Sequence, residues 1–344
     1  MKNNEIISST ELAIIAGASQ SAFSAFLSAF LAATVVLGAS AHVTQSLSNP
    51  GLHTLKPQDI VYADSGNAID GGFVIKVDPA TGGQTVISSG GYLQMPFDPV
   101  IDVNGQIVVS DSGRLVRINP DTGVQQVIAD NSRGTLGFPY GIAFNRAGQI
   151  LAANLQSLVQ VDPLTSQVST VSAGGNFLYP LGVAVAANGE LFVLNMAFPA
   201  QIVRVNPQNG VQKVISQGGL LNHPQSITIS GEDIYVTDVA TPDGNFGVGR
   251  VIHVDAHTGD QAVVSEGRNL IGPVGIAVDQ NGQLIVGDPY TVNCKSPDLA
   301  DGGYDGGIIR IDPATGEQTV LARGEGGFVN PRGVAIVPNP AATH

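Results

Sequence analysis

Short apolar runs separated by tight turns dominate the chain from about residue 57 onward. One unit, residues 139–172, shows the pattern. "PYGIAFN" is followed by the turn "RAGQ", then by "ILAAN" and "LVQVDP", the turn "LTSQ" and finally "VSTVS". Runs of about 4–8 residues that are rich in β-branched side chains and bounded by turn residues are typical of β-strands. The pattern therefore predicts four short strands joined by hairpins.

This unit recurs along the chain and carries a repeated phrase. Its six copies are "IKVDPATGGQTV" (75–86), "VRINPDTGVQQV" (116–127), "VQVDPLTSQVST" (159–170), "VRVNPQNGVQKV" (203–214), "IHVDAHTGDQAV" (252–263) and "IRIDPATGEQTV" (309–320). Asp or Asn can bond back to the backbone, Pro presets φ, and Gly takes the left-handed position, so the phrase is predicted to be the outer hairpin of each unit. Successive copies are 41, 43, 44, 49 and 57 residues apart. Four strands per 40–50 residues is the signature of a β-propeller blade.

A second phrase, Pro-x-Gly-[Ile/Val]-Ala, begins the first strand of each unit. It starts at Pro139, Pro180, Pro273 and Pro331, with altered forms at Pro96 and Pro224. Gly suits an innermost strand, where six strands crowd around one axis. The chain begins this region with a second strand (59–64) and ends it with an inner strand (332–337). The sequence thus predicts an all-β, six-bladed propeller whose C-terminal strand completes the first blade and removes exposed sheet edges.

At this point the residues carry a resemblance to a family. "FPYGIAFNRAGQILAAN" and "IGPVGIAVDQNGQLIVGD" look like NHL-repeat propellers. That group is similar in shape to the virginiamycin B lyases, the peptide-amidating lyases and the gluconolactonase-type propellers. The resemblance covers about residues 57–337. It implies the fold and leaves the function open, because one ring hosts enzymes, receptors and scaffolds.

Composition narrows the classes of partner. Only 12% of residues are charged and the net charge is −13. An acidic chain lacks the basic stripe that nucleic acid requires and has no electrostatic attraction to anionic lipid. The one cysteine, Cys294, excludes an intrachain disulfide.

The first 41 residues differ from the repeats. Residues 12–41 carry no charge and end in Ala39-Ser40-Ala41, a pattern that signal peptidase cuts. Three alternatives stay open: a cleaved signal peptide, a retained membrane helix, or an apolar helix that packs in an oligomer or polymer through its small residues. All three place the rest of the chain outside the cytoplasm, as a secreted or anchored protein. Residues 42–56 are then a linker and residues 57–340 the propeller.

Two rings of side chains are expected on one face of the propeller. The first follows the second strands and consists of Asp64, Asp111, Asn154, Asn195, Asp238 and Asp288. Such residues commonly accept backbone N–H groups of the following turn. Alternatively, the four aspartates form an acidic arc that could hold Ca²⁺, which prefers several oxygen ligands.

The second ring flanks the inner-strand prolines and supplies the candidate ligand-binding residues. They are Phe97, Tyr140, Tyr179, His223, Gln225 and Arg332. The turns between the second and third strands are long at 238–250, 288–307 and 64–72, which belong to blades 5, 6 and 1 respectively. Elaborated loops on a rigid scaffold are where function tends to lie.

These features favour a non-catalytic module that binds a protein or small molecule on the long-loop face, or that assembles through its N-terminal helix. The alternative is a metal-dependent lyase or hydrolase that uses the acidic arc, His223 and Arg332. The lyase propellers that the chain resembles rely on histidines grouped near the axis, and only His223 occupies such a position here. No nucleophile elbow, phosphate loop or zinc spacing occurs in the sequence.

Overall fold

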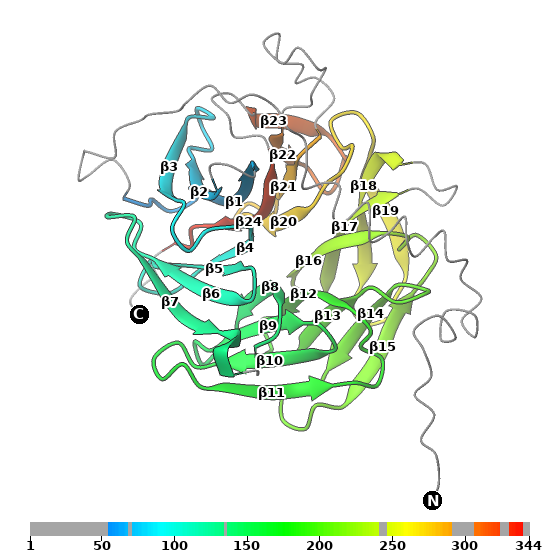
Figure 1. Ribbon diagram of the computed structural model, residues 1–344. Helices are drawn as coiled ribbons and strands as arrows, with labels where there is room; N and C mark the ends of the chain where they lie inside the picture. Colours follow the sequence, from blue (N-terminus) through cyan, green and yellow to red (C-terminus); the bar gives the residue numbers. More distant parts are fainter. Residues whose placement is uncertain are drawn as a thin grey trace, which may run out of the picture. The chain divides into compact units, whose positions relative to one another are not determined.

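Six four-stranded sheets stand around a central axis in the computed structural model (Figure 1). The residues that the structure describes are 54–67, 71–133, 136–240, 246–290, 306–323 and 330–339. Neighbouring strands within each sheet run antiparallel. The predicted six-bladed β-propeller is confirmed.

The strands are named here from the axis outward, blade by blade. Blade 1 consists of β24 (Pro331–Ile336), β1 (Ile60–Asn67), β2 (Gly71–Val77) and β3 (Gln84–Ser89). Blade 2 consists of β4 (Pro96–Ile101), β5 (Ile107–Asp111), β6 (Arg114–Ile118) and β7 (Gln125–Asp130). Blade 3 consists of β8 (Pro139–Phe144), β9 (Ile150–Asn154), β10 (Ser157–Val161) and β11 (Val168–Ala173). Blade 4 consists of β12 (Pro180–Val185), β13 (Leu191–Asn195), β14 (Gln201–Val205) and β15 (Gln212–Gln217). Blade 5 consists of β16 (Pro224–Ser230), β17 (Asp233–Ala240), β18 (Phe246–Asp255) and β19 (Gln261–Glu266). Blade 6 consists of β20 (Gly275–Val278), β21 (Leu284–Asp288), β22 (Gly307–Ile311) and β23 (Gln318–Arg323). A short 3₁₀ helix, η1 (Asn131–Arg133), follows β7.

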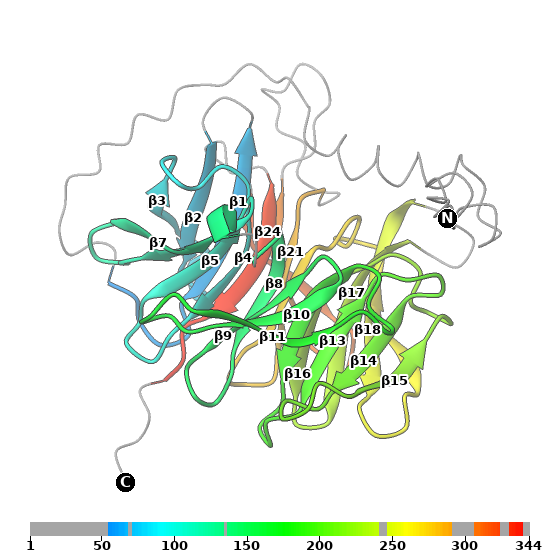
Figure 2. The same cartoon turned by 60° about the horizontal axis from the view of Figure 1, so that its bottom comes forward.

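The last strand closes the ring as the sequence predicts. β24 pairs with β1, with Ile60 opposite Ile336 and Tyr62 opposite Val334. Figures 1 and 2 both show β24 beside β1 although the two strands lie at opposite ends of the chain. Blade 1 therefore has an inner strand only because the C-terminal segment supplies it.

The ring has two faces, which we distinguish by their loops. On the upper face, the chain crosses from one blade into the inner strand of the next, and turns of different lengths join the second strand to the third. On the lower face lie the turns between the first and second strands and the repeated Asp/Asn-Pro-x-Thr-Gly turns between the third and fourth. The repeated phrase is thus the outer hairpin, as predicted.

The hydrophobic core is divided into six clusters, one at each boundary between neighbouring blades. Strand β5 shows why the second strands are buried on both faces. Ile107 and Val109 belong to the cluster shared with blade 1, whereas Val108 belongs to the cluster shared with blade 3. Because successive side chains of a strand point to opposite faces, a fully apolar run fills two cores at once.

In four blades, a glutamine six residues after the Asp or Asn of the repeated phrase fastens the outer hairpin to a serine of the preceding blade. Gln261 Nε2 donates to Ser216 Oγ (2.8 Å) and to the Gly218 carbonyl (3.0 Å), and Gln261 Oε1 accepts the Leu220 N–H (2.6 Å). We call this arrangement the Ser–Gln clasp. Equivalent clasps join Gln125 to Ser88, Gln212 to Ser172 and Gln318 to Ser265.

Blade 3 departs from this pattern. Val168 stands where the other blades have glutamine, and Ala129 of blade 2 stands where the clasp has serine. Both residues belong to the apolar cluster between blades 2 and 3. Within the described part of the chain, that boundary is therefore packed by hydrophobic contact where four others carry the clasp.

Candidate functional site

Six buried carboxylate or amide side chains end the second strands at the upper face. They are the last residues of β5, β9, β13 and β21 and lie inside β1 and β17, whereas the sequence placed them just after the strands. Their exposed fractions are 5% or less. The six are Asp64, Asp111, Asn154, Asn195, Asp238 and Asp288.

Each of these side chains accepts N–H groups from the loop that enters the inner strand of the same blade. Asp238 Oδ2 accepts the N–H groups of Asn222 (2.8 Å) and His223 (3.0 Å). Asn154 Oδ1 accepts the Phe138 N–H (2.6 Å). These donors lie 15 or 16 residues before the acceptor, so the principal bonds go to the preceding loop, whereas the sequence suggested the following turn. The ring holds the upper-face loops in place.

In blade 1 the same interaction joins the two ends of the propeller. Asp64 Oδ2 accepts the Asn330 N–H (3.1 Å), and its Oδ1 accepts the Gly66 N–H (2.7 Å). Asn330 immediately precedes β24, 266 residues from Asp64. This carboxylate therefore anchors the loop that delivers the closing strand.

Burial strongly affects the ionisation of these carboxyls. It raises the pKa of Asp64 and of Asp288 to about 6, although bonds from backbone N–H groups act in the opposite direction. Burial also raises the pKa of Asp111, against the same kind of backbone bonds. Among the residues that the structure describes, no three His, Cys, Asp or Glu side chains gather as metal ligands. Calcium binding by Asp64, Asp111, Asp238 and Asp288 stays a prediction.

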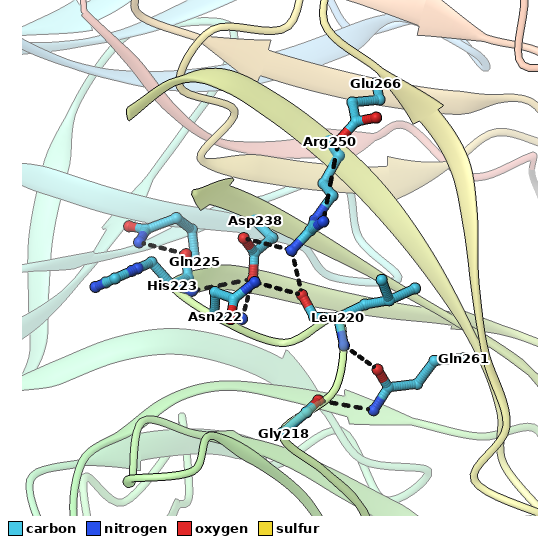
Figure 3. A network of polar contacts seen from close by, with 9 residues as sticks. All are labelled: Gly218, Leu220, Asn222, His223, Gln225, Asp238, Arg250, Gln261 and Glu266. Atoms are coloured by element: carbon cyan, nitrogen blue, oxygen red, sulfur yellow. Dashed lines mark hydrogen bonds and ion pairs between the residues drawn. The ribbon is translucent and has the colours of Figure 1, made fainter. Parts of the chain in front are cut away.

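A buried arginine supports this network in blade 5 (Figure 3). Arg250 in β18 is only 1% exposed, and its Nη2 donates to the Leu220 carbonyl. The same nitrogen lies 3.7 Å from Asp238 Oδ1, and Nη1 lies 3.9 Å from Glu266 Oε1. Arg250 therefore fixes both the carboxylate and the loop that carries His223. Arg250 is the last residue of the long turn 238–250, but nothing in its repeat singles it out as a partner of Asp238.

His223 and Gln225 lie together at the upper end of β16. Gln225 Nε2 donates to the His223 carbonyl (3.1 Å), and in Figure 3 both side chains lie on the opposite side of Asp238 from Arg250. Burial lowers the pKa of the His223 imidazole, which favours its neutral form. These two predicted site residues are thus neighbours, held by backbone that Asp238 fixes.

Three aromatic rings meet at the upper ends of β4 and β8. The centroid of Phe97 is 5.8 Å from that of Phe138 and 5.4 Å from that of Tyr140, and the last two rings are 5.1 Å apart. Tyr179 of the next blade is 41% exposed. Burial raises the pKa of Tyr140, and Tyr179 raises it further. We call these four residues the aromatic group; three were predicted, and Phe138 was recognised only as a flank of its proline.

Arg332 lies apart from the aromatic group, in β24. Its Nε donates to Ser65 Oγ (3.2 Å). Burial lowers the pKa of its guanidinium, whereas Tyr290 and Asp64 act in the opposite direction. Of the predicted ligand-binding residues, the structure therefore brings together Phe97 with Tyr140 and Tyr179, and His223 with Gln225. Arg332 contacts different neighbours.

Asp98 is an axial carboxyl that sequence reasoning missed. It stands in β4 at the position where four other inner strands have glycine. Its Oδ2 accepts the Ile142 N–H of blade 3 (2.8 Å), and a Cβ on Gly333 of blade 1 would lie 2.4 Å from its Oδ1. Burial raises the pKa of Asp98 to about 7. The signal was present as an aspartate in "PFDPV", which was taken only as an altered copy of the phrase.

Much of the three long turns falls outside the described residues. This applies to residues 68–70, 241–245 and 291–305. The strand ends that carry these turns, at β1 and β2, β17 and β18, and β21 and β22, all belong to the upper face. The long turns therefore start from the same face as the aromatic group.

Comparison with known proteins supports the architecture. No protein-family model matches the sequence, and neither does any curated protein. A chain from the crystal structure of a nidogen–laminin complex matches the fold with a TM-score of 0.61 and 14% sequence identity, over 81% of this chain and 98% of that one. At this identity the similarity concerns the fold alone, and it agrees with the expected relationship in shape to other propellers.

The N-terminal prediction concerns residues 1–53, which lie outside the described part of the chain. In the ranges that the structure does describe, we find no helix with the length and apolar character needed to cross a membrane.

Proposed function

We propose that this propeller is an extracytoplasmic binding module whose protein partner docks on the upper face. The observation that carries the proposal is the aromatic group at the upper ends of blades 2 to 4. Phe97, Phe138 and Tyr140 are half-buried and pack against one another, and Tyr179 is exposed beside them. Aromatic side chains that are pre-positioned on a rigid scaffold supply large contact area at little entropic cost, and they are enriched in protein interfaces.

Polar side chains complete this face on the opposite side of the axis. His223 and Gln225 come from blade 5 and Arg332 comes from blade 1, and their supporting loops are fixed by buried bonds to Asp238 and Asp64. The partner would therefore meet an apolar half and a hydrogen-bonding half. The strand ends that carry the long turns of blades 5, 6 and 1 belong to the same face, and these turns are part of the proposed interface.

The fold supports this reading in a general way. Propellers often serve as protein-binding modules, and the similar chain comes from a nidogen–laminin complex, which is itself an assembly of two proteins. A binding role needs a rigid scaffold with variable loops on one face. This chain has both features.

The alternative, a metal-dependent lyase or hydrolase, has weaker support. Burial lowers the pKa of His223 and so favours the neutral imidazole that a metal ligand or a general base requires. However, His223 and Arg332 belong to blades 5 and 1, with blade 6 between them, and they contact different groups.

The N-terminal segment supplies a second part of the proposal. Residues 12–41 are uncharged and would either be removed during export or retained as an anchor or an assembly helix. The intact mass of the native protein decides among these routes. A chain that starts at His42 contradicts the anchor and the assembly helix, whereas a chain that starts near Met1 contradicts the cleaved signal.

The docking proposal is tested by selecting binders from a random peptide library displayed on phage, with the purified protein as bait. We expect selected peptides to lose binding to the double variant Phe97→Ala/Tyr140→Ala. They should retain binding to Leu164→Ala, which removes an 89%-exposed apolar side chain from the lower face. Equal loss in both variants, or no loss in the first, contradicts the proposal. A second variant in which two residues replace 291–305 reports whether the long turn contributes, since loop length itself costs little stability.

A further inference from the structure

One position on the third strands repeats a basic residue type in five of the six blades. It is occupied by Lys76, Arg117, Gln160, Arg204, His253 and Arg310. Three of these side chains meet a carboxylate at the start of the second strand of the same blade. Arg204 lies 3.1 Å from Glu190, His253 lies 2.7 Å from Asp233, and Lys76 lies 3.8 Å from Asp59.

Blades 2 and 6 have glutamine in place of that carboxylate, at Gln106 and Gln283. Arg117 compensates by reaching the next blade, where its Nη2 donates to the Pro163 carbonyl (3.1 Å). Arg310 does not make the equivalent bond to Pro79. In the described part of the chain, no oxygen accepts a hydrogen bond from Arg310, and its Nε is buried without a partner.

Arg310 lines a pocket at the lower face, between blades 6 and 1. The pocket has a volume of about 300 Å³. The walls are mainly apolar and include Ile60, Ile285 and Ile336, together with Pro79 and Ala80 of the repeated turn. We call it the closure pocket, because it lies where the closing strand completes the ring.

We propose that the closure pocket binds a small carboxylic acid with a compact apolar body, whose carboxylate pairs with Arg310. A guanidinium presents a planar fork of donors that matches a carboxylate in a bidentate pair. Ligand sites are typically concave and apolar with a few polar groups that fix orientation. An apolar wall with one unpaired arginine has this composition.

One carboxylate, Asp279, also lines the pocket and must be accounted for. Its Oδ1 accepts the N–H groups of Asn281 (2.8 Å) and Gln283 (2.9 Å), so its charge is directed into the turn between β20 and β21. No ion pair joins Asp279 to Arg310 among the described residues. The guanidinium is therefore available to an incoming anion.

The test uses benzoate as the probe and isothermal titration of the full chain as the measurement. We expect saturable binding of benzoate, at least tenfold weaker binding of neutral benzamide, and at least a tenfold loss of benzoate affinity in Arg310→Gln. The matched control is Arg204→Gln, which removes the equivalent arginine of blade 4 and should leave benzoate binding unchanged.

A second variant keeps the proposal testable if Arg310→Gln folds poorly. Ala80→Phe places a ring in the exposed mouth of the pocket without altering Arg310, and it should abolish binding. Benzoate that binds equally to Arg310→Gln or to Ala80→Phe, benzamide that binds as tightly as benzoate, or no binding of benzoate to the parent would each overturn the proposal. These outcomes are independent of the upper-face interface, because no upper-face residue lines the closure pocket.

Discussion

The boundary between blades 4 and 5 and the boundary between blades 2 and 3 join neighbouring blades by different means. At the first, Gln261 spans the rim and bonds to three backbone or side-chain groups of blade 4 or the loop that follows it. At the second, Ala129 and Val168 replace the polar pair, and the bonds across the boundary include one near the axis, from the Ile142 N–H to Asp98. A neutral amide thus fastens one boundary, whereas a titratable carboxyl fastens the other.

The glycine of the repeated turn differs in the same way. Gly259 has φ +80°, and a Cβ there would lie 2.1 Å from the Ile215 carbonyl of blade 4. Ser166 occupies the equivalent position in blade 3 and keeps a positive φ of 61°. The turn needs glycine only where its backbone lies in close contact with the preceding blade. The glycine of the repeated phrase therefore reflects contact between blades as well as the conformation of the turn.

The largest expected effect comes from removing the closing strand, which creates a third kind of boundary. Deleting residues 331–344 removes β24, including Val334, and exposes Ile60 and Tyr62 of the cluster between blades 6 and 1. Loss of two or three buried aliphatic side chains costs at least about 5 kcal/mol of unfolding free energy. Urea unfolding measures it. An unchanged midpoint would contradict the closure of the ring by β24.

Substitutions at the glycine position of the repeated turn should change the free energy of unfolding by a smaller amount, and with opposite sign at the two kinds of boundary. Gly210→Ser in blade 4 should destabilise by roughly 2–4 kcal/mol, because φ is +70° and a Cβ would lie 2.4 Å from the Val171 carbonyl. Ser166→Gly in blade 3 should stabilise by about 0.5–1 kcal/mol, since it relieves a left-handed residue. Thermal unfolding of both variants tests the comparison. Equal effects of one sign would show that the two boundaries do not differ at this turn.

Gln261→Ala breaks the clasp between blades 4 and 5. It leaves the Leu220 N–H and the Gly218 carbonyl without their bonds, which costs about 1–3 kcal/mol. The control Gln208→Ala removes an exposed glutamine of the neighbouring turn and should change stability by less than about 0.5 kcal/mol. If the two variants unfold at the same urea concentration, the clasp contributes nothing.

Asp98→Asn concerns the boundary fastened near the axis, and its effect depends on pH. The folded pKa of about 7 lies above the ordinary value of 3.8, so the folded state binds the proton more tightly than the unfolded state. The resulting stability is complete below about pH 4 and is lost as the pH rises through 7. Asparagine cannot ionise, and a shift of about three pKa units corresponds to roughly 4 kcal/mol, so the variant should gain up to about that much relative to the parent at pH 8. Unfolding at pH 4, 6 and 8 measures this gain. A constant difference across these values would contradict a raised pKa.

The sequence alone was sufficient for the architecture and for the place of the buried polar ring. Alternating apolar runs, the spacing of the repeated phrase and the position of the last inner strand predicted six blades and their closure. These features depend on local periodicity, which a single sequence displays. The six members of the buried polar ring were also predicted from the sequence, because every blade has an Asp or Asn at this position.

The hydrogen-bond partners of those residues could not be predicted from the sequence. The bonds of Asp238 lead to a loop 15 residues upstream, and the clasp joins Gln261 to a serine 45 residues away, so both depend on how neighbouring strands and blades are placed. The glutamine itself was visible in five of the six phrases. Asp98 was missed because it is the exception in its repeat. Arg310 was missed because it follows its repeat, and only the structure shows that, among the described residues, it lacks the partner that Arg204 has.

The most direct test of the upper-face interface is hydrogen–deuterium exchange of the protein with and without a peptide selected for binding. The account predicts slower exchange at residues 138–142, 179–183 and 222–226, which carry Phe138, Tyr140, Tyr179 and His223. The lower-face turns at 119–124 and 162–167 should exchange as in the free protein. Protection confined to those lower turns, with none near Tyr140, would contradict the account.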